Sequence, residues 1–229
     1  MNGITHVFFD LDHTLWDYET NARETLTEVF DNYGINAYYS SANAFINSFH
    51  YTNSKLWKRY NSGEIDRDFI RANRFRLLFE NRGSISDTLN GTISDYFFQT
   101  CPRKTALIDG AIGVLDRLSE EYELGIITNG FEDTQNIKLR ESGIRKYFEH
   151  VITSETAGHR KPSAAIFELA QSMSGATSDT AIMIGDNYNT DISGAKNANW
   201  RAFWFNPENS NTYDHDLQIQ ELSELLDHL

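Results

Sequence analysis

Residues 4–14 read ITHVFFDLDHT, an apolar and β-rich run that leads directly into two carboxylates. A run of this composition and length is typical of a strand that is buried on both faces of a parallel sheet. Asp10 and Asp12 follow at the point where the chain leaves this strand. The stretch therefore predicts both an α/β fold and a polar site at the end of its first strand.

Four further runs share this apolar, β-rich character. They are residues 124–128, 150–153, 181–184 and 201–205. The stretches between them carry apolar residues at helical spacing, as in Ile112, Leu115 and Leu118. This alternation of strand and helix predicts right-handed βαβ crossovers and a mostly parallel sheet with helices on both faces.

Residues 17–105 interrupt the alternation, because they read as consecutive helices without a convincing strand. Four apolar stripes at helical spacing mark this region. They cover residues 22–33, 45–60, 69–77 and 85–97. The sequence thus predicts a core of residues 1–16 and 106–229 and an inserted four-helix domain of residues 17–105. An insert at this point is expected over the carboxyl edge of the sheet, where it could act as a lid.

The overall charge disfavours some classes of partner. Thirty-three acidic residues against 20 basic ones give a formal net charge of −13, which would repel a nucleic-acid polymer or an anionic membrane surface. No apolar run approaches the roughly 20 residues that span a bilayer, and the N-terminus lacks a signal-peptide pattern. Cys101 is the only cysteine, so we expect a cytoplasmic protein without intrachain disulfides. Monomer and homodimer are both compatible with the sequence.

Asp10 and Asp12 are spaced so that both carboxylates can face one cavity as the chain turns out of the strand. Two neighbouring carboxylates favour a divalent cation, which relieves their mutual repulsion. The pattern alone is weak evidence for function, because many such turns are simply solvated loops.

Three further polar segments each follow a different predicted strand. Thr128 and Asn129 come directly after the second strand, Lys161 precedes a predicted helix over residues 163–173, and Asp186 and Asp191 flank the loop after the fourth strand. Hydroxyl, amide and ammonium groups suit phosphate oxygens, and carboxylates suit a metal. Each segment also has an ordinary structural explanation as a helix cap, a surface lysine or a solvated loop.

In sequence and order, these four segments resemble the four motifs of the haloacid dehalogenase superfamily. The matching residues are Asp10 to Thr14, Thr128, Lys161, and Gly185–Asp186 with Asp191. The resemblance covers nearly the whole chain and implies a Rossmann-like core with strand order 3-2-1-4-5 and an inserted helical cap domain. Residues 8–17 and 128–131 are also similar to the pyrimidine 5′-nucleotidase branch of the superfamily.

The resemblance implies roles for the two N-terminal acids. Asp10 would attack phosphorus and form an aspartyl-phosphate intermediate, and Asp12 would be its acid/base partner. Magnesium would be bound by the Asp10 carboxylate, the Asp12 backbone carbonyl and Asp186. Asp191 would orient either a metal-bound water or Lys161.

The remaining residues would bind the substrate phosphate. Lys161 would neutralise charge on the phosphoryl oxygens, while Thr128 and Asn129 hold them in place. The expected substrate is a small phosphorylated metabolite. A nucleoside 5′-monophosphate is the first choice, and the alternatives are a sugar-phosphate or phosphoglycolate phosphatase and a non-catalytic relative that binds a phosphorylated ligand.

Five aromatic residues are candidates for stacking on a nucleobase. They are Trp16, Tyr18, Tyr51, Trp57 and Tyr60. An aromatic stripe at helical spacing serves helix packing more often than ligand binding, so the sequence leaves both roles open.

Overall fold

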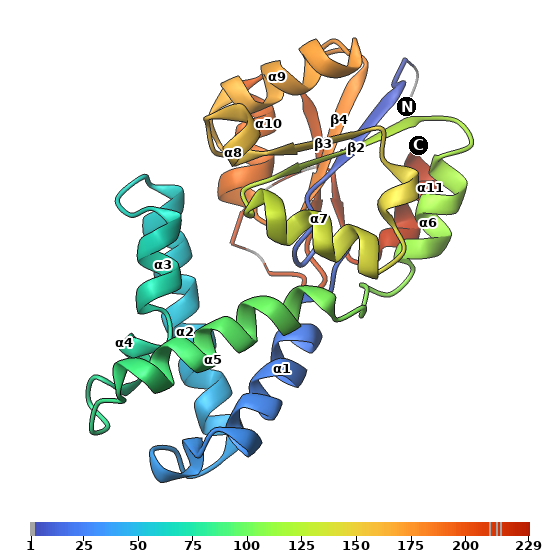
Figure 1. Ribbon diagram of the computed structural model, residues 1–229. Coiled ribbons are helices and arrows are strands. Elements are labelled where there is room, and N and C mark those ends of the chain that lie inside the picture. Colours follow the sequence, from blue (N-terminus) through green and yellow to red (C-terminus); the bar gives the residue numbers. More distant parts are fainter. Residues whose placement is uncertain (1–2, 211, 214, 216) are drawn as a thin grey trace. The chain divides into compact units, whose positions relative to one another are not determined.

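The computed structural model describes residues 3–210, 212–213, 215 and 217–229. Contacts divide the chain into two compact units, Met1–Tyr18 with Thr105–Leu229, and Glu19–Lys104. Figure 1 traces both units along the chain. The boundaries expected from the sequence differ from these by only one or two residues.

The first unit is built on a six-stranded parallel sheet. Its strands are β1 (His6–Phe9), β2 (Glu123–Thr128), β3 (His150–Thr153), β4 (Ala181–Gly185), β5 (Arg201–Phe205) and β6 (Gln218–Ile219). Their order is β3-β2-β1-β4-β5-β6, with every neighbouring pair parallel. The predicted α/β class and the order of the first five strands are confirmed. The two-residue β6 is too short to show any periodicity in the sequence.

Strand β1 occupies the middle of the sheet, which explains its continuous apolar sequence. Val7, Phe8 and Phe9 are all buried. Phe8 pairs in register with Gly125 on β2, and a Cβ atom at Gly125 would lie 2.5 Å from the Phe8 ring. Glycine at this position therefore gives the large ring room to lie across the neighbouring strand.

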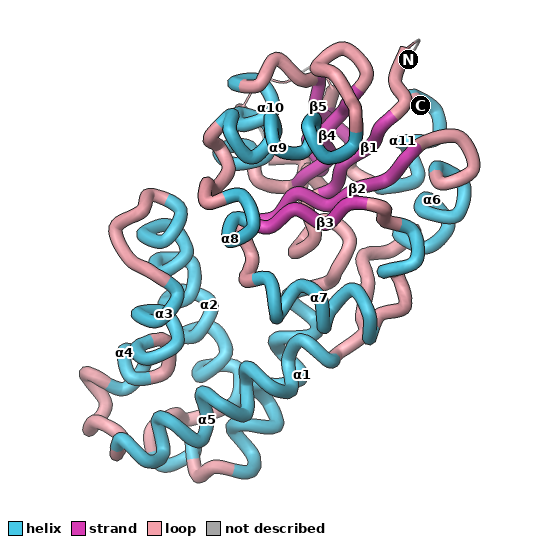
Figure 2. Tube along the Cα trace, turned by 45° about the horizontal axis from the view of Figure 1, so that its top comes forward, coloured by secondary structure: helices cyan, strands magenta, loops and turns pink. Residues whose placement is uncertain are grey.

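Helices cover both faces of this sheet. They are α6 (Ala111–Leu118), α7 (Glu132–Glu141), α8 (Ser154–Ala157), α9 (Ala164–Ser174), α10 (Ser193–Asn197) and α11 (Leu225–His228). Figure 2 shows α9 and α10 on one side of the strands and α6 and α7 on the other. On the α9 side, Phe8 packs in one apolar cluster with Phe167 and Ala195. The sheet is thus buried on both faces, as its strand sequences predicted.

Shorter helical segments complete the connections. They are the 3₁₀ turns Ile35–Ala37, Cys101–Arg103, Arg145–Tyr147 and Leu222–Glu224, and the π-helical turn Tyr188–Ile192.

The helix predicted over residues 163–173 is α9, which begins one residue later, at Ala164. Ser163 is the N-cap, and its side chain accepts a hydrogen bond from the backbone N–H of Ala165 at 3.4 Å. A serine oxygen at this position satisfies a first-turn N–H, so the helix begins after Ser163. Pro162 therefore lies outside the helix, next to a cis peptide bond with Lys161.

The second unit consists of helices. They are α1 (Tyr18–Asn32), α2 (Ala42–Asn61), α3 (Arg67–Asn73), α4 (Arg76–Phe79) and α5 (Asp87–Thr100). Three of them begin at side-chain caps, Ser41 for α2, Asp66 for α3 and Ser86 for α5. These caps satisfy first-turn N–H groups that have no partner inside the helix.

The third predicted helical stretch, residues 69–77, is divided between α3 and α4. The Arg74 N–H still bonds to the carbonyl of Ile70, four residues back, whereas the Leu78 N–H bonds to Phe75, only three residues back. This tighter bonding interrupts the α-helix. Arg74 is buried at the break, with its guanidinium 5.1 Å from the ring centroid of Phe98.

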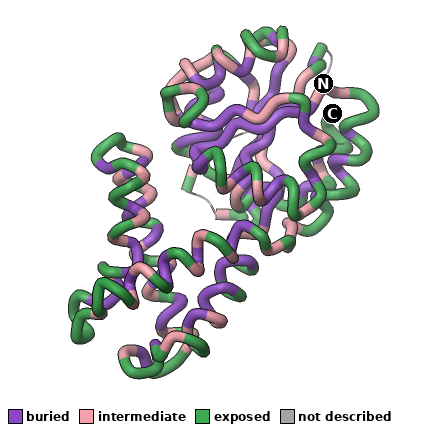
Figure 3. The backbone as a smooth tube through the Cα atoms, viewed as in Figure 1, coloured by how far each residue is buried: buried purple, intermediate pink, exposed green. Residues whose placement is uncertain are grey.

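Aromatic side chains form the centre of the second unit, where Figure 3 shows the inward helix faces buried. The fully buried ones include Phe45, Phe49, Phe75 and Phe79. Cys101 is also buried. Among the described residues, no helix combines the length and the apolar character that a membrane span requires.

Candidate active site

Three strands deliver polar side chains to one edge of the sheet. Asp10 directly follows β1, Thr128 is the last residue of β2, and Asp186 directly follows β4. Because β1 lies between β2 and β4, Asp10 is at the centre of this edge. Its backbone N–H donates to the carbonyl of Ile184 at 2.8 Å, which extends the β1–β4 ladder up to the carboxylate itself.

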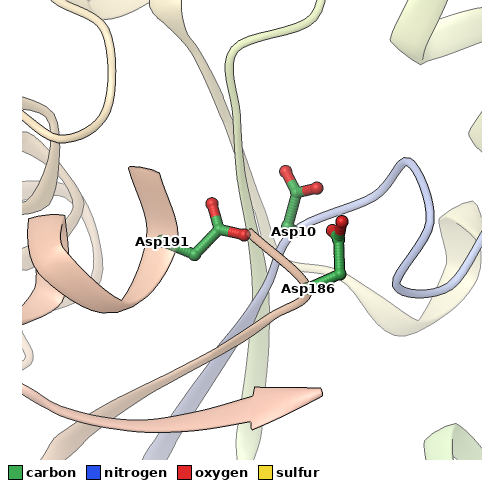
Figure 4. A group of neighbouring side chains, drawn as sticks. All are labelled: Asp10, Asp186 and Asp191. Atoms are coloured by element: carbon green, nitrogen blue, oxygen red, sulfur yellow. The ribbon is translucent and has the colours of Figure 1, made fainter. Parts of the chain in front are cut away.

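Asp10, Asp186 and Asp191 form a carboxylate cluster at this edge, drawn in Figure 4. One oxygen from each side chain lies within 4.8 Å of the other two. Asp10 and Asp191 are buried, and Asp186 is half-buried. Asp191 comes from the turn Tyr188–Ile192. The structure thus brings together carboxylates that the sequence places on two separate loops.

Lys161 provides the positive charge of the site. Its ammonium donates to Asp10 Oδ1 at 2.7 Å and to the backbone carbonyl of Ile127 at 2.6 Å, and it lies 2.7 Å from Asp191 Oδ1. An ammonium has three N–H groups, so each one finds an acceptor. Lys161 is only 1% exposed, so these three acceptors replace the water that would otherwise stabilise its charge.

The cluster shifts the pKa values of its members. Burial raises the pKa of Asp10 to about 8, with Lys161 opposing the shift and Asp191 and Asp186 adding to it. Burial also raises the pKa of Asp186 to about 7, and the charge of Asp191 adds to the effect. For Lys161, burial acts to lower the pKa, but Asp10 and Asp191 outweigh it and raise the pKa. The raised pKa of Lys161 keeps its ammonium charged. The raised pKa values of Asp10 and Asp186 indicate that too little positive charge surrounds these carboxylates to favour their ionised forms.

The three carboxylates of the cluster could hold a metal ion. Three carboxylates share one ammonium, so a divalent cation would supply the missing positive charge, and oxygen ligands are those that Mg²⁺ prefers. Asp10 and Asp186, the two side-chain ligands expected from the sequence, both belong to this cluster. Binding of magnesium by the backbone carbonyl of Asp12 stays a prediction.

Asp191 is held from several sides. Its Oδ1 accepts from the Thr190 hydroxyl at 3.1 Å and contacts Lys161, while Oδ2 accepts from the Asn187 N–H at 3.0 Å. A Cβ atom at Gly185 would lie 2.3 Å from Asp191 Oδ2, so only glycine leaves room for this carboxylate. Of the two roles expected for Asp191, the geometry favours orienting Lys161.

Thr14, in the segment after β1, and Trp204, on β5, fix the position of Asp186. The Thr14 hydroxyl donates to Asp186 Oδ1 and accepts from the Asp186 N–H, both at 3.1 Å. The indole N–H of Trp204, on β5, donates to the Asp186 carbonyl at 2.8 Å. The loop after β4 is therefore held by the segment after the first strand on one side and by β5 on the other.

Asn129 contacts the backbone of Lys161. Its Oδ1 accepts from the Lys161 N–H at 2.8 Å, and its Nδ2 donates to the Lys161 carbonyl at 3.0 Å. These two hydrogen bonds join the β2 loop to the residue that carries the ammonium. The predicted contact between the Asn129 amide and a substrate phosphate stays a prediction.

Thr128 and Asp12 are both held by α7, a helix that the apolar pattern of the sequence did not reveal. Gln135 Nε2 donates to Thr128 Oγ1 at 2.8 Å and to Asp12 Oδ2 at 2.9 Å. Lys138 Nζ lies 2.5 Å from Asp12 Oδ1. Burial acts to raise the pKa of Asp12, but the charge of Lys138 and the hydrogen bonds from Lys138 and Gln135 together outweigh it, and the net shift is downward. Gln135 and Lys138 are thus part of the site's environment.

The sequence contains a signal that points to Gln135 and Lys138. Parallel strands β2 and β3 require a crossover of a dozen or more residues, which predicts a helix between residues 131 and 149. Gln135 and Lys138 are three residues apart, the spacing of neighbours on one helix face. Apolar periodicity does not mark the helix, because its sequence, EDTQNIKLRE, carries only two apolar residues.

Burial separates the aromatic candidates for base stacking. Trp16 and Tyr60 are 0% and 2% exposed, whereas Tyr51 is 63% exposed. Trp16 and Tyr60 are therefore packing residues of their respective units. Tyr18 and Trp57 are half-buried.

Comparison with known proteins places the chain among relatives of similar length. The sequence profile of the haloacid dehalogenase-like hydrolases matches residues 4–199. The chain is 29% identical over 226 residues to pyrimidine 5′-nucleotidase PynA of Streptococcus pneumoniae, covering 96% of this chain and 93% of that protein. It is also 29% identical over 204 residues to pyrimidine 5′-nucleotidase YjjG of Escherichia coli, covering 87% and 85%.

A solved structure gives the same result for the fold. The crystal structure of the putative HAD-hydrolase YfnB from Bacillus subtilis, bound to magnesium, matches with a TM-score of 0.88 and 25% identity over 99% of this chain and 98% of that one. The matched range includes the carboxylate cluster of Asp10, Asp186 and Asp191 as well as Lys161. This chain therefore belongs to the haloacid dehalogenase-like hydrolase family.

Proposed function

We propose that this protein is a Mg²⁺-dependent phosphatase that hydrolyses nucleoside 5′-monophosphates through an aspartyl-phosphate formed on Asp10. The observation that carries the proposal is the setting of Asp10, which is buried at the centre of the sheet edge with Oδ1 accepting a hydrogen bond from Lys161. Among the described residues, no other side chain donates to this carboxylate. Oδ2 is thus the oxygen available to attack phosphorus.

The reaction proceeds in two displacements. In the first, Asp10 Oδ2 forms a bond to phosphorus while the bond to the leaving alcohol breaks, and Asp12 gives the leaving oxygen a proton. In the second, Asp12 takes a proton from water, which attacks the aspartyl-phosphate and releases inorganic phosphate and free Asp10. Two such steps are each easier than direct hydrolysis. Lys161 and Thr128 stabilise the charge on the phosphoryl oxygens.

The metal requirement rests on the carboxylate cluster. When bound by Asp10 and Asp186, Mg²⁺ would neutralise charge on the phosphoryl group. The cluster supplies oxygen ligands and has more carboxylates than cationic partners. The likeness to YfnB, whose crystal structure contains magnesium, supports the same choice of ion.

Two observations support a phosphate ester as the substrate. Asp12 provides an acid beside the nucleophile, and an alkoxide leaving group needs a proton whereas a halide does not. Two relatives that match most of this chain are pyrimidine 5′-nucleotidases, which favours a nucleoside 5′-monophosphate over a sugar phosphate or phosphoglycolate.

The test is phosphate release from a panel of nucleoside monophosphates, sugar phosphates and phosphoglycolate, with Mg²⁺ and with chelator. Asp10→Asn is the blank. We expect Mg²⁺-dependent release by the wild type alone, fastest with a nucleotide. Preference for a sugar phosphate or phosphoglycolate would replace the proposed substrate. Absence of release from every member would favour a non-catalytic protein that binds a phosphorylated ligand.

A further inference from the structure

Both oxygens of the Asp12 carboxylate are held by α7. Lys138 Nζ lies 2.5 Å from Oδ1, and Gln135 Nε2 donates to Oδ2 at 2.9 Å. The two donors are buried, with exposed fractions of 5% and 0%, whereas the Asp12 side chain is 25% exposed. Asp12 is thus accessible from the solvent side of the site and anchored from the protein side.

Gly130 and Trp16 stabilise the positions of the Gln135 and Lys138 side chains. A Cβ atom at Gly130 would lie 2.0 Å from Gln135 Nε2, so glycine is what allows the carboxamide to reach the site. The Lys138 ammonium lies 4.5 Å from the ring centroid of Trp16, which is itself fully buried. A cation over an aromatic face in a buried setting gains attraction that helps to offset its desolvation.

Gln135 also links Asp12 to the predicted phosphate site. Its Nε2 donates one hydrogen bond to Asp12 Oδ2 and another to Thr128 Oγ1, at 2.9 and 2.8 Å. A carboxamide nitrogen has two hydrogens, and both are used here. The Gln135 nitrogen therefore sets the distance between the Asp12 carboxylate and the Thr128 hydroxyl at the end of β2.

We propose that Gln135 and Lys138 are positioning residues that hold Asp12 on the leaving-group side of the bound phosphate. This inference rests on the proposed phosphatase function. A carboxylate on a loop can adopt several side-chain rotamers, and proton transfer requires the one that reaches the leaving oxygen. Two anchors on α7 select that rotamer before the substrate arrives, which lowers the entropic cost of the transition state.

The test compares two leaving groups in Lys138→Met and Gln135→Met. The substrates are a nucleoside 5′-monophosphate, whose alkoxide needs a proton, and 2,4-dinitrophenyl phosphate, whose phenolate departs without one. The constant to measure is kcat/KM, which reports the steps up to release of the alcohol. We expect each variant to lose about 10- to 100-fold with the nucleotide and less than about threefold with the aryl ester.

A second measurement asks whether Lys138 acts through Asp12. Asp12→Asn alone should show a larger loss with the same leaving-group dependence. Adding Lys138→Met to Asp12→Asn should then cost little more, because the residue that Lys138 positions is already disabled. Lys146→Met is the matched control, since Lys146 is an exposed lysine of the same unit beside Tyr147, and it should change neither substrate's rate.

The outcomes separate this inference from the function on which it rests. Absence of phosphate release by the wild type overturns the proposed function and the inference with it. With an active wild type, equal losses on both substrates, fully additive losses in the double variant, or a gain in rate overturns the inference alone. Thermal unfolding identifies a variant that fails to fold, and Gln135→Met, which retains Lys138, then decides.

Discussion

Lys161 Nζ lies 2.7 Å from Asp10 Oδ1, although 151 residues separate the two in the chain. The same ammonium also contacts Asp191 and the Ile127 carbonyl, so its position is defined by three different segments. One oxygen of Asp10 is occupied by this contact. In the proposed mechanism, this contact orients Asp10 and places a positive charge beside the atoms that would react.

Replacement of Asp10, the proposed nucleophile, gives the first prediction. Asp10→Asn should lower phosphate release by about 10⁴-fold or more, because an amide cannot form the acyl phosphate. The protein should remain folded, since the Asn amide oxygen can still accept from Lys161. The measurement is phosphate release by the purified variant beside its thermal unfolding curve. Hydrolysis at the wild-type rate would rule out Asp10 as the nucleophile.

The raised pKa values predict how pH affects the metal-free protein. Asp10 and Asp186 have pKa values of about 8 and about 7 in the folded state, against 3.8 for an ordinary aspartate. Between pH 3.8 and about 8, the folded protein binds more protons than the unfolded chain. The contribution of Asp10 and Asp186 to the free energy of unfolding therefore falls as pH rises. In chelator, the unfolding midpoint should be lower at pH 8 than at pH 5, by about 3 °C or more.

Magnesium should reverse this loss. A cation that binds ionised carboxylates competes with protons, so saturating Mg²⁺ should raise the midpoint more at pH 8 than at pH 5. Asp10→Asn is the control, and it should weaken both the pH dependence and the magnesium effect. An equal Mg²⁺ shift at both pH values, or an unchanged shift in the variant, would contradict binding by this cluster.

The space at Gly185 gives a stability prediction. Gly185→Ala would place a methyl group 2.3 Å from Asp191 Oδ2, so the carboxylate would have to leave its contacts. We expect a loss of about 1–3 kcal/mol in the free energy of unfolding. Gly113→Ala is the matched control, because Gly113 lies in α6 and a Cβ atom there would meet none of the described neighbours within 4 Å. This control should stabilise the protein by about 0.5–1 kcal/mol. Denaturant titration of both variants checks the difference, and similar results for the two would contradict the argument.

Asn129 exchanges two hydrogen bonds with the Lys161 backbone, and enzyme kinetics can show whether it positions Lys161 or binds the substrate. If Asn129 positions Lys161, Asn129→Ala should lower kcat by about tenfold or more and leave KM nearly unchanged, because the proposed role of Lys161 is to stabilise the charge of the transition state. A rise in KM at constant kcat would instead indicate that Asn129 binds the substrate phosphate. Steady-state kinetics with the preferred substrate gives the answer.

Much of the core was predictable because its signals are local. The run at residues 4–10 predicts a doubly buried strand, and β1 lies in the middle of the sheet. The same reasoning failed for α7, whose polar sequence conceals a helix that only its role as a crossover requires. It also failed at residues 69–77, where the burial of Arg74 against aromatic rings accompanies a break that helical spacing does not reveal.

The identities and order of Asp10, Asp12, Lys161 and Asp186 were legible in the sequence, because each lies in a polar segment that follows an apolar run. Their partners were not. Gln135 and Lys138 meet Asp12 across more than 120 residues, and Asn129 meets the Lys161 backbone rather than standing free at the strand end. Such contacts arise from the strand order and from the side-chain packing between α7 and the strand ends. No local pattern encodes them, because hydrogen-bond partners in a folded chain depend on distances in space rather than on separation along the chain.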